Sequence, residues 1–344
     1  MSEVGLLREM LGIYSPSCDE REMAELIVRF ALEHGLAAHI DDAGNAVVEA
    51  GDGGQELLLL GHMDTVEGMI PVREQGGLLY GRGAVDAKGP LACFLCALAR
   101  VKGKLQGKRV VVVGAVEEEH HTSKGARHVC ESHNPEMIII GEPSGLDALT
   151  LGYKGCLQVR LSQRSSASHG AGREESASDR ALAFHAEARA YVQGFNAGKG
   201  EMERLTLRVK GLDRQQTPFE ERISLTLGFR LPLGFDPSHL KERLSALAGA
   251  GELEFFGEEM PYAAGKSNRL VSAFLRALRS QGLEPRFTMK NGTSDMNVVG
   301  PRFKVPIVAY GPGDPSLDHT PDEHVRIEDY LRAIDVMEKV LLGL

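Results

Sequence analysis

Acidic and imidazole side chains recur in this 344-residue sequence directly after short apolar runs. Imidazoles and carboxylates together are the ligands that zinc, cobalt and manganese take in proteins. Because several such groups follow apolar runs that contain little else polar, the pattern indicates a metal site rather than solvated loop acids. The groups are His62 and Asp64 after LLLLG, Asp86 in GRGAVDAKGP, Glu117, Glu118 and Glu119 after VVVVGAV, Glu142 after MIIIG, and His319 after VAYGPGDPSLD.

The number of candidate ligands favours two ions over one. Two imidazoles and three carboxylates would over-supply a single ion. Two ions that share one carboxylate would each keep an imidazole, a carboxylate and an open place for water. Ions in such co-catalytic sites lie roughly 3.5–4 Å apart. The sequence therefore predicts a dinuclear hydrolytic centre.

The apolar runs themselves predict the elements that position these groups. They occupy residues 57–60, 110–113, 137–140 and 305–310, and a helix is expected over 19–34. Continuous rather than alternating hydrophobicity is typical of strands covered on both faces, so we expect an α/β fold with a mostly parallel sheet flanked by helices. Ligand sites in open α/β sheets lie beyond the carboxyl ends of the strands, where these groups should converge.

The pattern changes between residues 154 and 260, where apolar and polar residues alternate along several segments. Alternation is typical of strands with one buried face. With two helices between them, the strands predict the order β-α-β-β-α-β of a ferredoxin-like α+β domain. Since the first pattern resumes afterwards, we expect a discontinuous catalytic domain, residues 1–153 and 261–344, with residues 154–260 inserted as a separate domain.

The composition of the chain argues against nucleic acid and membranes as binding partners. Lys and Arg number 39 against 48 Asp and Glu, and this net charge of −9 argues against a general nucleic-acid binder, which needs a basic surface. No apolar run approaches the ~20 residues of a membrane helix. The five cysteines lack the spacing of a secreted disulfide framework. We therefore expect a cytoplasmic protein that binds neither nucleic acid nor membrane.

The motifs GHMDTV, GRGAVDAKG, EEE, GEPS and DHTPDEH, in this order, resemble those of the co-catalytic zinc amidohydrolases. That family includes acetylornithine deacetylase, succinyl-diaminopimelate desuccinylase and the aminoacylases. The resemblance covers nearly the whole chain. It implies a hydrolase of linear amides with two divalent ions, zinc or cobalt, in a zinc-exopeptidase-like catalytic domain. It also implies that the inserted domain is a lid through which two copies form a homodimer.

The resemblance implies a role for each motif residue. One ion would be held by His62, Asp86 and Glu142, and the other by Asp86, Glu119 and His319. Glu118 matches the general base, and Asp64 matches the carboxylate that orients the His62 imidazole. The sequence departs from the family at Glu117, where an aspartate is common, and at His120 and His121. An imidazole at either position could change which metal is preferred.

Three segments are expected to contact substrate. His169 in SASHGA matches a family histidine that reaches across the dimer to polarise the scissile carbonyl, although an exposed loop histidine is the alternative interpretation. Arg230, at the end of ISLTLGFR, matches an arginine that holds a substrate carboxylate in a fork. Gly292, Thr293 and Ser294 should bring backbone and hydroxyl donors to the substrate.

Within the family, NGTSDMN and the segment after it look most like the enzymes that release lysine, and in some cases ornithine, from an amino-group carrier protein in lysine and arginine biosynthesis. Such a carrier is small and acidic. Residues 154–251 hold 15 Lys and Arg against 11 Asp and Glu, an excess of four positive charges that could steer it.

Two other functions stay open. One is an N-acetylornithine or N-acetyl-lysine deacetylase, or a related N-acyl amino-acid deacylase, with the same chemistry. The other is a catalytically inactive metal-binding or peptide-binding homologue. The presence of Glu118 beside a full ligand set argues against the inactive homologue, because a binding module has no need for a general base.

Overall fold

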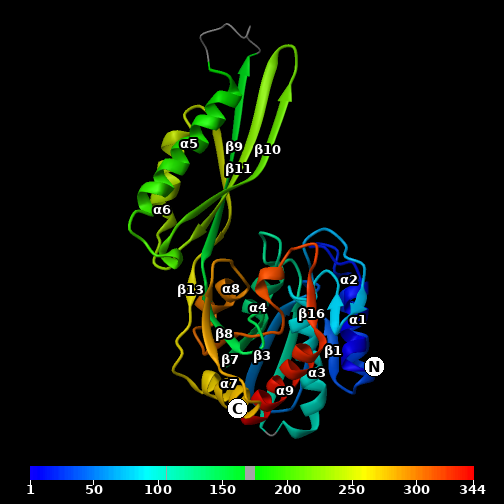
Figure 1. The fold of residues 1–344 in the computed structure, drawn as a ribbon. Coiled ribbons are helices and arrows are strands. Elements are labelled where there is room, and N and C mark those ends of the chain that lie inside the picture. The colour runs from blue at the N-terminus through cyan, green and yellow to red at the C-terminus, as the bar shows by residue number, and fades with distance from the viewer. Residues whose placement is uncertain (106, 167–174) are drawn as a thin grey trace. The chain divides into compact units, whose positions relative to one another are not determined.

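The computed structural model describes residues 1–105, 107–166 and 175–344. These residues form two compact units (Figure 1). The first unit consists of Met1–Gly152, Ala263–Lys290 and Ser294–Leu344, and the second of Tyr153–Tyr262 and Asn291–Thr293. The first unit is therefore built from segments far apart in the sequence, and the second contributes one short segment from the loop near residue 292.

Within the described residues of the first unit, nine strands form one sheet in the order β1-β2-β6-β3-β7-β15-β8-β13, with β14 paired to β8. The central strands β6, β3, β7 and β15 run parallel, as the apolar runs predict. The strands are β1 (Ala37–Ile40), β2 (Ala46–Ala50), β3 (Gln55–His62), β6 (Lys108–Ala115), β7 (Met137–Gly141), β8 (Ala148–Tyr153), β13 (Tyr262–Ala263), β14 (Arg286–Lys290) and β15 (Ile307–Ala309).

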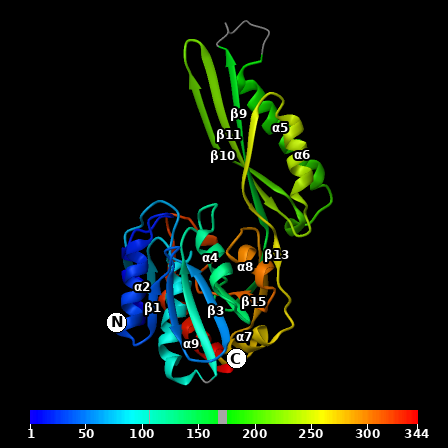
Figure 2. The ribbon, with the colours of Figure 1, turned by 180° about the vertical axis from the view of Figure 1, so that it is seen from behind.

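Helices explain why the central strands are apolar throughout. Leu57 and Leu59 of β3 join a core cluster with residues of the helices, and Leu58 and Leu60 are equally buried on the opposite face. Helix α3 packs against α9 and β3, and α4 packs against α8 and β6 (Figures 1 and 2). The helices are α1 (Glu3–Gly12), α2 (Arg21–Glu33), α3 (Lys88–Val101), α4 (Lys124–Ser132), α7 (Arg269–Ser280), α8 (Met296–Phe303) and α9 (Ile327–Gly343).

A small antiparallel sheet in the same unit brings the chain's C-terminal part beside its N-terminal part. It has the order β16-β5-β4, with β4 (Arg73–Gln75), β5 (Leu78–Tyr80) and β16 (His324–Arg326). Val325 of β16 lies opposite Leu79 of β5. The loops on either side of this pairing, which carry Asp86 and His319, are thereby held close to one another. Two short 3-10 helices, η1 (Lys102–Lys104) and η3 (Pro315–Leu317), complete the unit.

The second unit is a four-stranded antiparallel sheet in the order β10-β11-β9-β12, with helices α5 and α6 packed together beside it (Figure 1). Its elements are β9 (Gly155–Ser166), α5 (Ala177–Phe195), η2 (Glu201–Glu203), β10 (Thr206–Gln216), β11 (Glu220–Leu231), α6 (Pro237–Leu247) and β12 (Glu252–Glu259). On β11, every second residue from Ile223 to Leu231 is buried. The predicted β-α-β-β-α-β order and α/β class are confirmed.

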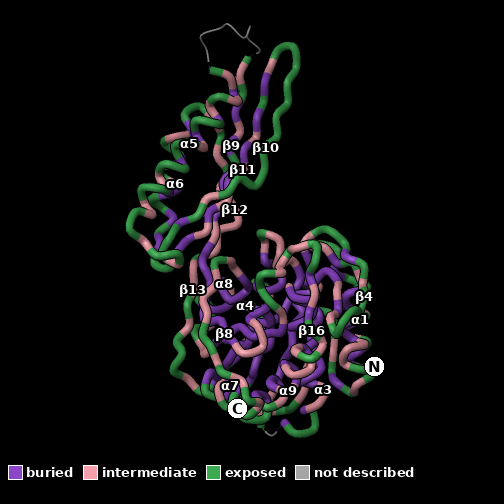
Figure 3. The backbone as a smooth tube through the Cα atoms, viewed as in Figure 1, coloured by how far each residue is buried: buried purple, intermediate pink, exposed green. Residues whose placement is uncertain are grey.

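Burial differs between the two sheets (Figure 3). Strand β7 is buried at all five positions, whereas β10 is exposed at nearly every position. The first sheet thus lies in the core of its unit, and the second carries an open edge strand. Among the described residues, no helix combines the length and apolarity that crossing a bilayer requires.

Candidate metal centre

The carboxyl ends of the central parallel strands carry the candidate ligands. His62 is the last residue of β3, Glu142 follows β7 directly, and Glu119 lies four residues beyond the end of β6. His319 comes from the loop after β15, and Asp86 precedes α3 by two residues. Because neighbouring parallel strands end at one edge of the sheet, chain segments more than 250 residues apart meet there.

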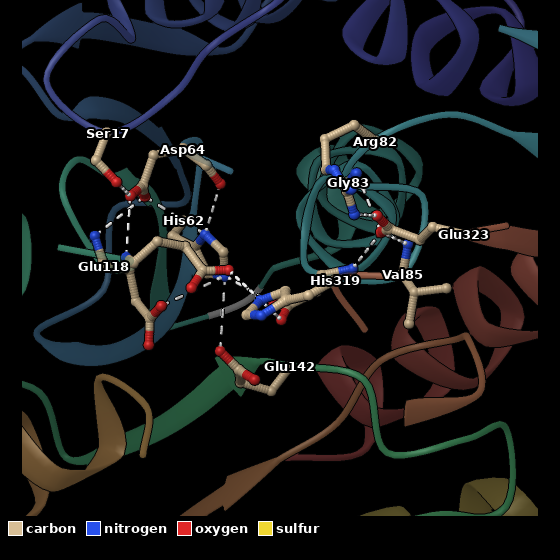
Figure 4. A network of polar contacts seen from close by, with 12 residues as sticks. Ser17, His62, Asp64, Arg82, Gly83, Val85, Glu118, Glu142, His319 and Glu323 are labelled. Atoms are coloured by element: carbon tan, nitrogen blue, oxygen red, sulfur yellow. Dashed lines mark hydrogen bonds and ion pairs between the residues drawn. The ribbon is translucent and has the colours of Figure 1, made fainter. Parts of the chain in front are cut away.

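Asp86 lies between the two imidazoles. Its Oδ1 is 3.1 Å from His62 Nε2, and its Oδ2 is 3.0 Å from His319 Nε2. One carboxylate oxygen faces each imidazole, which is the arrangement of a carboxylate that bridges two ions. Glu142 Oε1 lies 3.7 Å from His62 Nε2 (Figure 4). Glu119 Oε1 lies 2.7 Å from His319 Nε2. The five predicted ligands are therefore brought together.

Asp64 fixes the geometry around this cluster. Its backbone carbonyl lies 2.9 Å from His62 Nδ1, so that nitrogen donates its proton and leaves Nε2 free to bind a metal. Its buried carboxylate accepts hydrogen bonds from the Ser17 hydroxyl at 2.7 Å and from the backbone N–H groups of Glu118 and Glu119 at 3.0 and 2.9 Å. Asp64 thus orients an imidazole and the segment that carries the acids.

The carboxylates crowd one another. Burial raises the pKa of Glu142 well above its usual value, and the nearby Asp86 carboxylate adds to the rise. Burial and Asp86 also raise the pKa of Glu119. Burial raises the pKa of Glu118 well above its usual range, His62 opposes this, and Glu142 reinforces it. Such a concentration of buried acids needs compensating positive charge.

The pKa values of the two imidazoles are raised as well. Hydrogen bonds with Asp86 and Glu119 raise the pKa of His319 to about 10. Burial lowers the pKa of His62, but Glu118 and hydrogen bonds with Asp64 and Asp86 raise it well above its usual value. A set of nitrogen and oxygen donors that attracts protons this strongly fits divalent cations of the zinc class. Two groups, His62 with Glu118 and Glu142, and His62 with Asp86 and Glu119, have ligand atoms within 4.8 Å of one another.

Glu323 and Arg82 support the centre, and sequence reasoning did not identify them. Glu323 is fully buried, and its Oε1 accepts the backbone N–H groups of Gly83, Val85 and Asp86 at 3.0, 2.9 and 3.0 Å. Its Oε2 accepts a hydrogen bond from Arg82 Nη1 at 2.8 Å (Figure 4). The only signal in the sequence was its place in the motif DHTPDEH, four residues after His319.

The predicted substrate contacts fall in different places. In the second unit, Arg230 Nη1 donates to Thr293 Oγ1 at 2.7 Å, so these two are brought together. Gly292 belongs to the same short segment. Ser294 belongs to the first unit, where its buried hydroxyl accepts from the backbone N–H of Met296 at the start of α8. His169 lies outside the described residues, and its role stays a prediction.

Known proteins resemble this chain in sequence. A model described as peptidase family M20/M25/M40 matches residues 58–343. A protein of Deinococcus radiodurans named [LysW]-lysine hydrolase is 40% identical, over 98% of this chain and 96% of that protein. A [LysW]-lysine/[LysW]-ornithine hydrolase of Saccharolobus solfataricus is 30% identical, over 94% of this chain and 90% of that protein.

A solved structure has the same fold. The M20 family metallo-carboxypeptidase Sso-CP2 of Sulfolobus solfataricus gives a TM-score of 0.78 at 22% identity, over 100% of this chain and 99% of that chain. The resemblance read from the sequence motifs is therefore confirmed. From the family model and from relatives aligned along nearly its whole length, the chain belongs to peptidase family M20/M25/M40.

Proposed function

We propose that the chain is a metal-dependent amidohydrolase that releases lysine, and in some cases ornithine, from the LysW carrier protein, in lysine or arginine biosynthesis. The named relatives, aligned along nearly the full chain, support the substrate. The proposal of metal-dependent hydrolysis depends on one observation: Asp86 lies between two imidazoles, with further buried carboxylates beside it.

Two zinc or cobalt ions fit this donor set. His62, Asp86 and Glu142 would hold one, and Asp86, Glu119 and His319 would hold the other. Bound divalent ions supply a Lewis acid that polarises the scissile carbonyl and makes water a stronger acid. All five ligands are oxygen or nitrogen donors, which suits zinc and cobalt, and none is a thiol.

Glu118 is the proton carrier in this proposal. Its backbone N–H is fixed by Asp64, and its Oε2 lies 3.9 Å from His62 Nε2, so the carboxylate lies beside the proposed ligands. Its match to the general base in the family motif is the reason for proposing it as the base rather than as a ligand. There it can take a proton from water and deliver it to the leaving amine of lysine. Burial raises its pKa, and bound divalent ions would oppose that rise, so the carboxylate would stay ionised and able to accept a proton.

In the second unit, Arg230 and Thr293 form a donor pair suited to a carboxylate. The guanidinium supplies a planar fork, and the Thr293 hydroxyl at 2.7 Å limits its orientation. The released amino acid carries an α-carboxylate one carbon from the scissile nitrogen. We propose that Arg230 binds this carboxylate.

A homodimer through the second unit is part of the proposal. Strand β10 lies at the edge of its sheet, pairs only with β11 among the described strands and exposes Val209 and Leu212. Edge strands of this kind are ready to pair with another chain. Sedimentation of the purified protein would give the oligomeric state, and disruption of a dimer by Val209→Lys would support the use of β10.

The function is tested by supplying four substrates in parallel to the metal-loaded protein: LysW-linked lysine and ornithine, and the N-acetyl forms of both. Release of lysine from LysW at the highest kcat/KM supports the proposal. Preference for an acetylated amino acid would favour the small-molecule deacylase. Hydrolysis of none, by protein that holds two ions, would favour the inactive homologue. Glu118→Gln is the matched control for release that does not depend on the proposed base.

A further inference from the structure

A third group of ligand side chains lies next to the proposed dinuclear centre without belonging to it. Ligand atoms of Cys18, Glu117 and His120 all lie within 4.8 Å of one another. We propose that these three residues bind one further divalent cation of the zinc class. This inference goes beyond the proposed function, because no step of amide hydrolysis uses the three residues.

The residue types determine the class of ligand. A thiolate, an imidazole and a carboxylate are the three ligand types that zinc accepts, and thiolate disfavours calcium and magnesium. In a tetrahedral zinc site with bonds of ~2.0–2.3 Å, ligand atoms lie roughly 3.5 Å apart. To bind an ion, ligand atoms at the widest spacing in the group would have to approach one another by about 1 Å, which rotation of the side chains can provide. Three protein ligands leave the fourth position to water.

The site is held together by a carboxylate that is not itself a ligand. Glu20 is buried, and its Oε1 accepts the backbone N–H of Cys18 at 2.8 Å and that of Glu117 at 3.0 Å. Cys18 and Glu117 have φ values of 73° and 58°, which side-chain-bearing residues adopt rarely. Hydrogen bonds to one shared oxygen thus fix two segments about 100 residues apart with their side chains gathered.

Thr122 fixes the tautomer of the His120 imidazole. Its hydroxyl donates to Glu117 Oε2 and lies 3.0 Å from His120 Nδ1. Because the hydroxyl proton is used toward Glu117, the Thr122 oxygen accepts from Nδ1–H. This tautomer places the lone pair of His120 on Nε2, where a metal can bind. The contact is therefore the kind of outer hydrogen bond that fixes metal-binding histidines.

Solvent reaches the three residues, so an ion can enter. Cys18 is exposed, and Glu117 lines a surface pocket of about 450 Å³ together with Thr122 and Lys124. Lys124 Nζ is 3.9 Å from Glu117 Oε1 and is half exposed. An exposed ion pair of this kind is weak, so a divalent cation can displace the lysine from Glu117.

A cobalt titration of the metal-free, reduced, full-length protein tests the proposal. Thiolate bound to Co²⁺ gives a charge-transfer absorption in the near ultraviolet, and no ligand of the proposed dinuclear centre is a thiol. We expect three bound equivalents, one of which carries this absorption. Cys18→Ser should lose the band and one equivalent while two equivalents still bind.

Two further variants serve as controls for this titration. Cys18→Gly suits a φ of 73° and so preserves the fold while removing the thiol. Cys130→Ser removes a half-buried thiol of α4 outside the group and should keep the band. Two equivalents without the band, or a band that survives both Cys18 variants, would overturn the proposal. Neither readout depends on amide hydrolysis, so failure of the proposed function would be recognised separately.

Discussion

Glu323 accepts the backbone N–H of Asp86 at 3.0 Å, so a fully buried carboxylate from one loop fixes the residue that lies between the two imidazoles. The same Oε1 accepts two more backbone N–H groups of the segment before Asp86. Glu323 also follows His319 by four residues. It therefore ties together the two loops whose side chains approach each other at 3.0 Å.

Replacing Glu323 by Gln should therefore weaken metal binding. An amide cannot accept three N–H groups and also pair with the Arg82 guanidinium, so the Asp86 loop loses its anchor. Outer-shell partners of metal ligands are typically worth about 10–100-fold in metal affinity. Competition with a chromophoric chelator measures the affinity.

Glu56→Gln is the control for Glu323→Gln. Glu56 is also a buried carboxylate, but it lies at the start of β3, where it pairs with Arg109 at 2.6 Å. Its loss should lower the free energy of unfolding without changing metal affinity. Equal effects of both substitutions on metal affinity would show that Glu323 acts only through overall stability.

Glu118→Gln separates the base from the ligands. The substitution preserves side-chain size and leaves the five proposed ligands in place, so metal content should be unchanged. Loss of the proton acceptor should reduce kcat by about 10²–10⁴-fold. Glu119→Gln should instead lower the bound metal. Near wild-type turnover of Glu118→Gln would be incompatible with the proposed mechanism.

The pattern of apolar residues in the sequence predicted most of the strands. Continuous apolar runs predicted β3, β6 and β7 because both faces of these strands are covered, and alternation predicted β11 because only one face is. The last run was less informative. The apolar stretch 305–310 predicts a longer strand than β15, which spans only Ile307–Ala309. Tyr310 follows β15 and is buried although it lies outside the strand, so an apolar run there marks burial and not strand length.

Two kinds of sequence signal predicted the candidate ligands: a position at the end of a strand and a place in a family motif. His62 and Glu142 stand at strand ends, and motif order suggested roles for Asp86 and His319. Neither signal gave a role to Glu323, Arg82 or Ser17, although Arg82 and Glu323 lie in the motifs GRGAVDAKG and DHTPDEH, because each acts through hydrogen bonds to residues distant in sequence. Arg82 and Glu323, for example, are 241 residues apart. Whether a carboxylate is solvated or accepts three buried N–H groups depends on tertiary packing, which residue spacing does not encode.

Arg230→Lys should impair every substrate with an α-carboxylate. A lysine retains the charge but cannot supply two parallel N–H donors or the same contact with Thr293. The expected loss in kcat/KM corresponds to roughly 2–4 kcal/mol, as for other charge pairs that lose a partner. Arg208→Lys on the exposed strand β10 is the control and should leave kcat/KM unchanged. An unchanged kcat/KM for Arg230→Lys would remove Arg230 from substrate binding.

Glu221 should make the second unit sensitive to acid. Hydrogen bonds from Ser178 and Arg214 lower the pKa of Glu221 to about 2. Because the folded-state pKa lies below the unfolded value of ~4.3, the carboxylate stabilises the fold at neutral pH, and this contribution is lost as pH falls from about 4.3 towards 2. Glu221→Gln should lower the stability of the second unit at pH 7. Near pH 2 the stabilities of the variant and the wild type should become more similar.

Hydrogen exchange of the β9 and β11 amides at several pH values measures this effect within the second unit. Glu254→Gln is the control, because Glu254 is a largely exposed carboxylate of β12 that pairs with Arg160 at 2.7 Å. Its pH profile should match that of the wild type. A Glu221→Gln profile parallel to the wild type throughout would show that the hydrogen bonds to Ser178 and Arg214 do not stabilise the ionised form.

Salt should distinguish a carrier-linked substrate from a free one. Residues 154–251 carry an excess of four positive charges within a chain of net charge −9, and the second unit as a whole is neutral because β12 adds four glutamates. We therefore expect any attraction of an acidic carrier protein to come from the positive charges of residues 154–251, over distances that ionic strength controls. The screening length falls from ~10 Å at 0.1 M to ~3 Å at 1 M ionic strength, and kcat/KM for LysW-linked lysine should fall with it. An acetylated lysine offers no extended acidic surface, and its kcat/KM should change much less. Parallel assays from low to high salt measure both, and equal salt sensitivity for the two substrates would mean that the positive charges of residues 154–251 do not recruit the carrier.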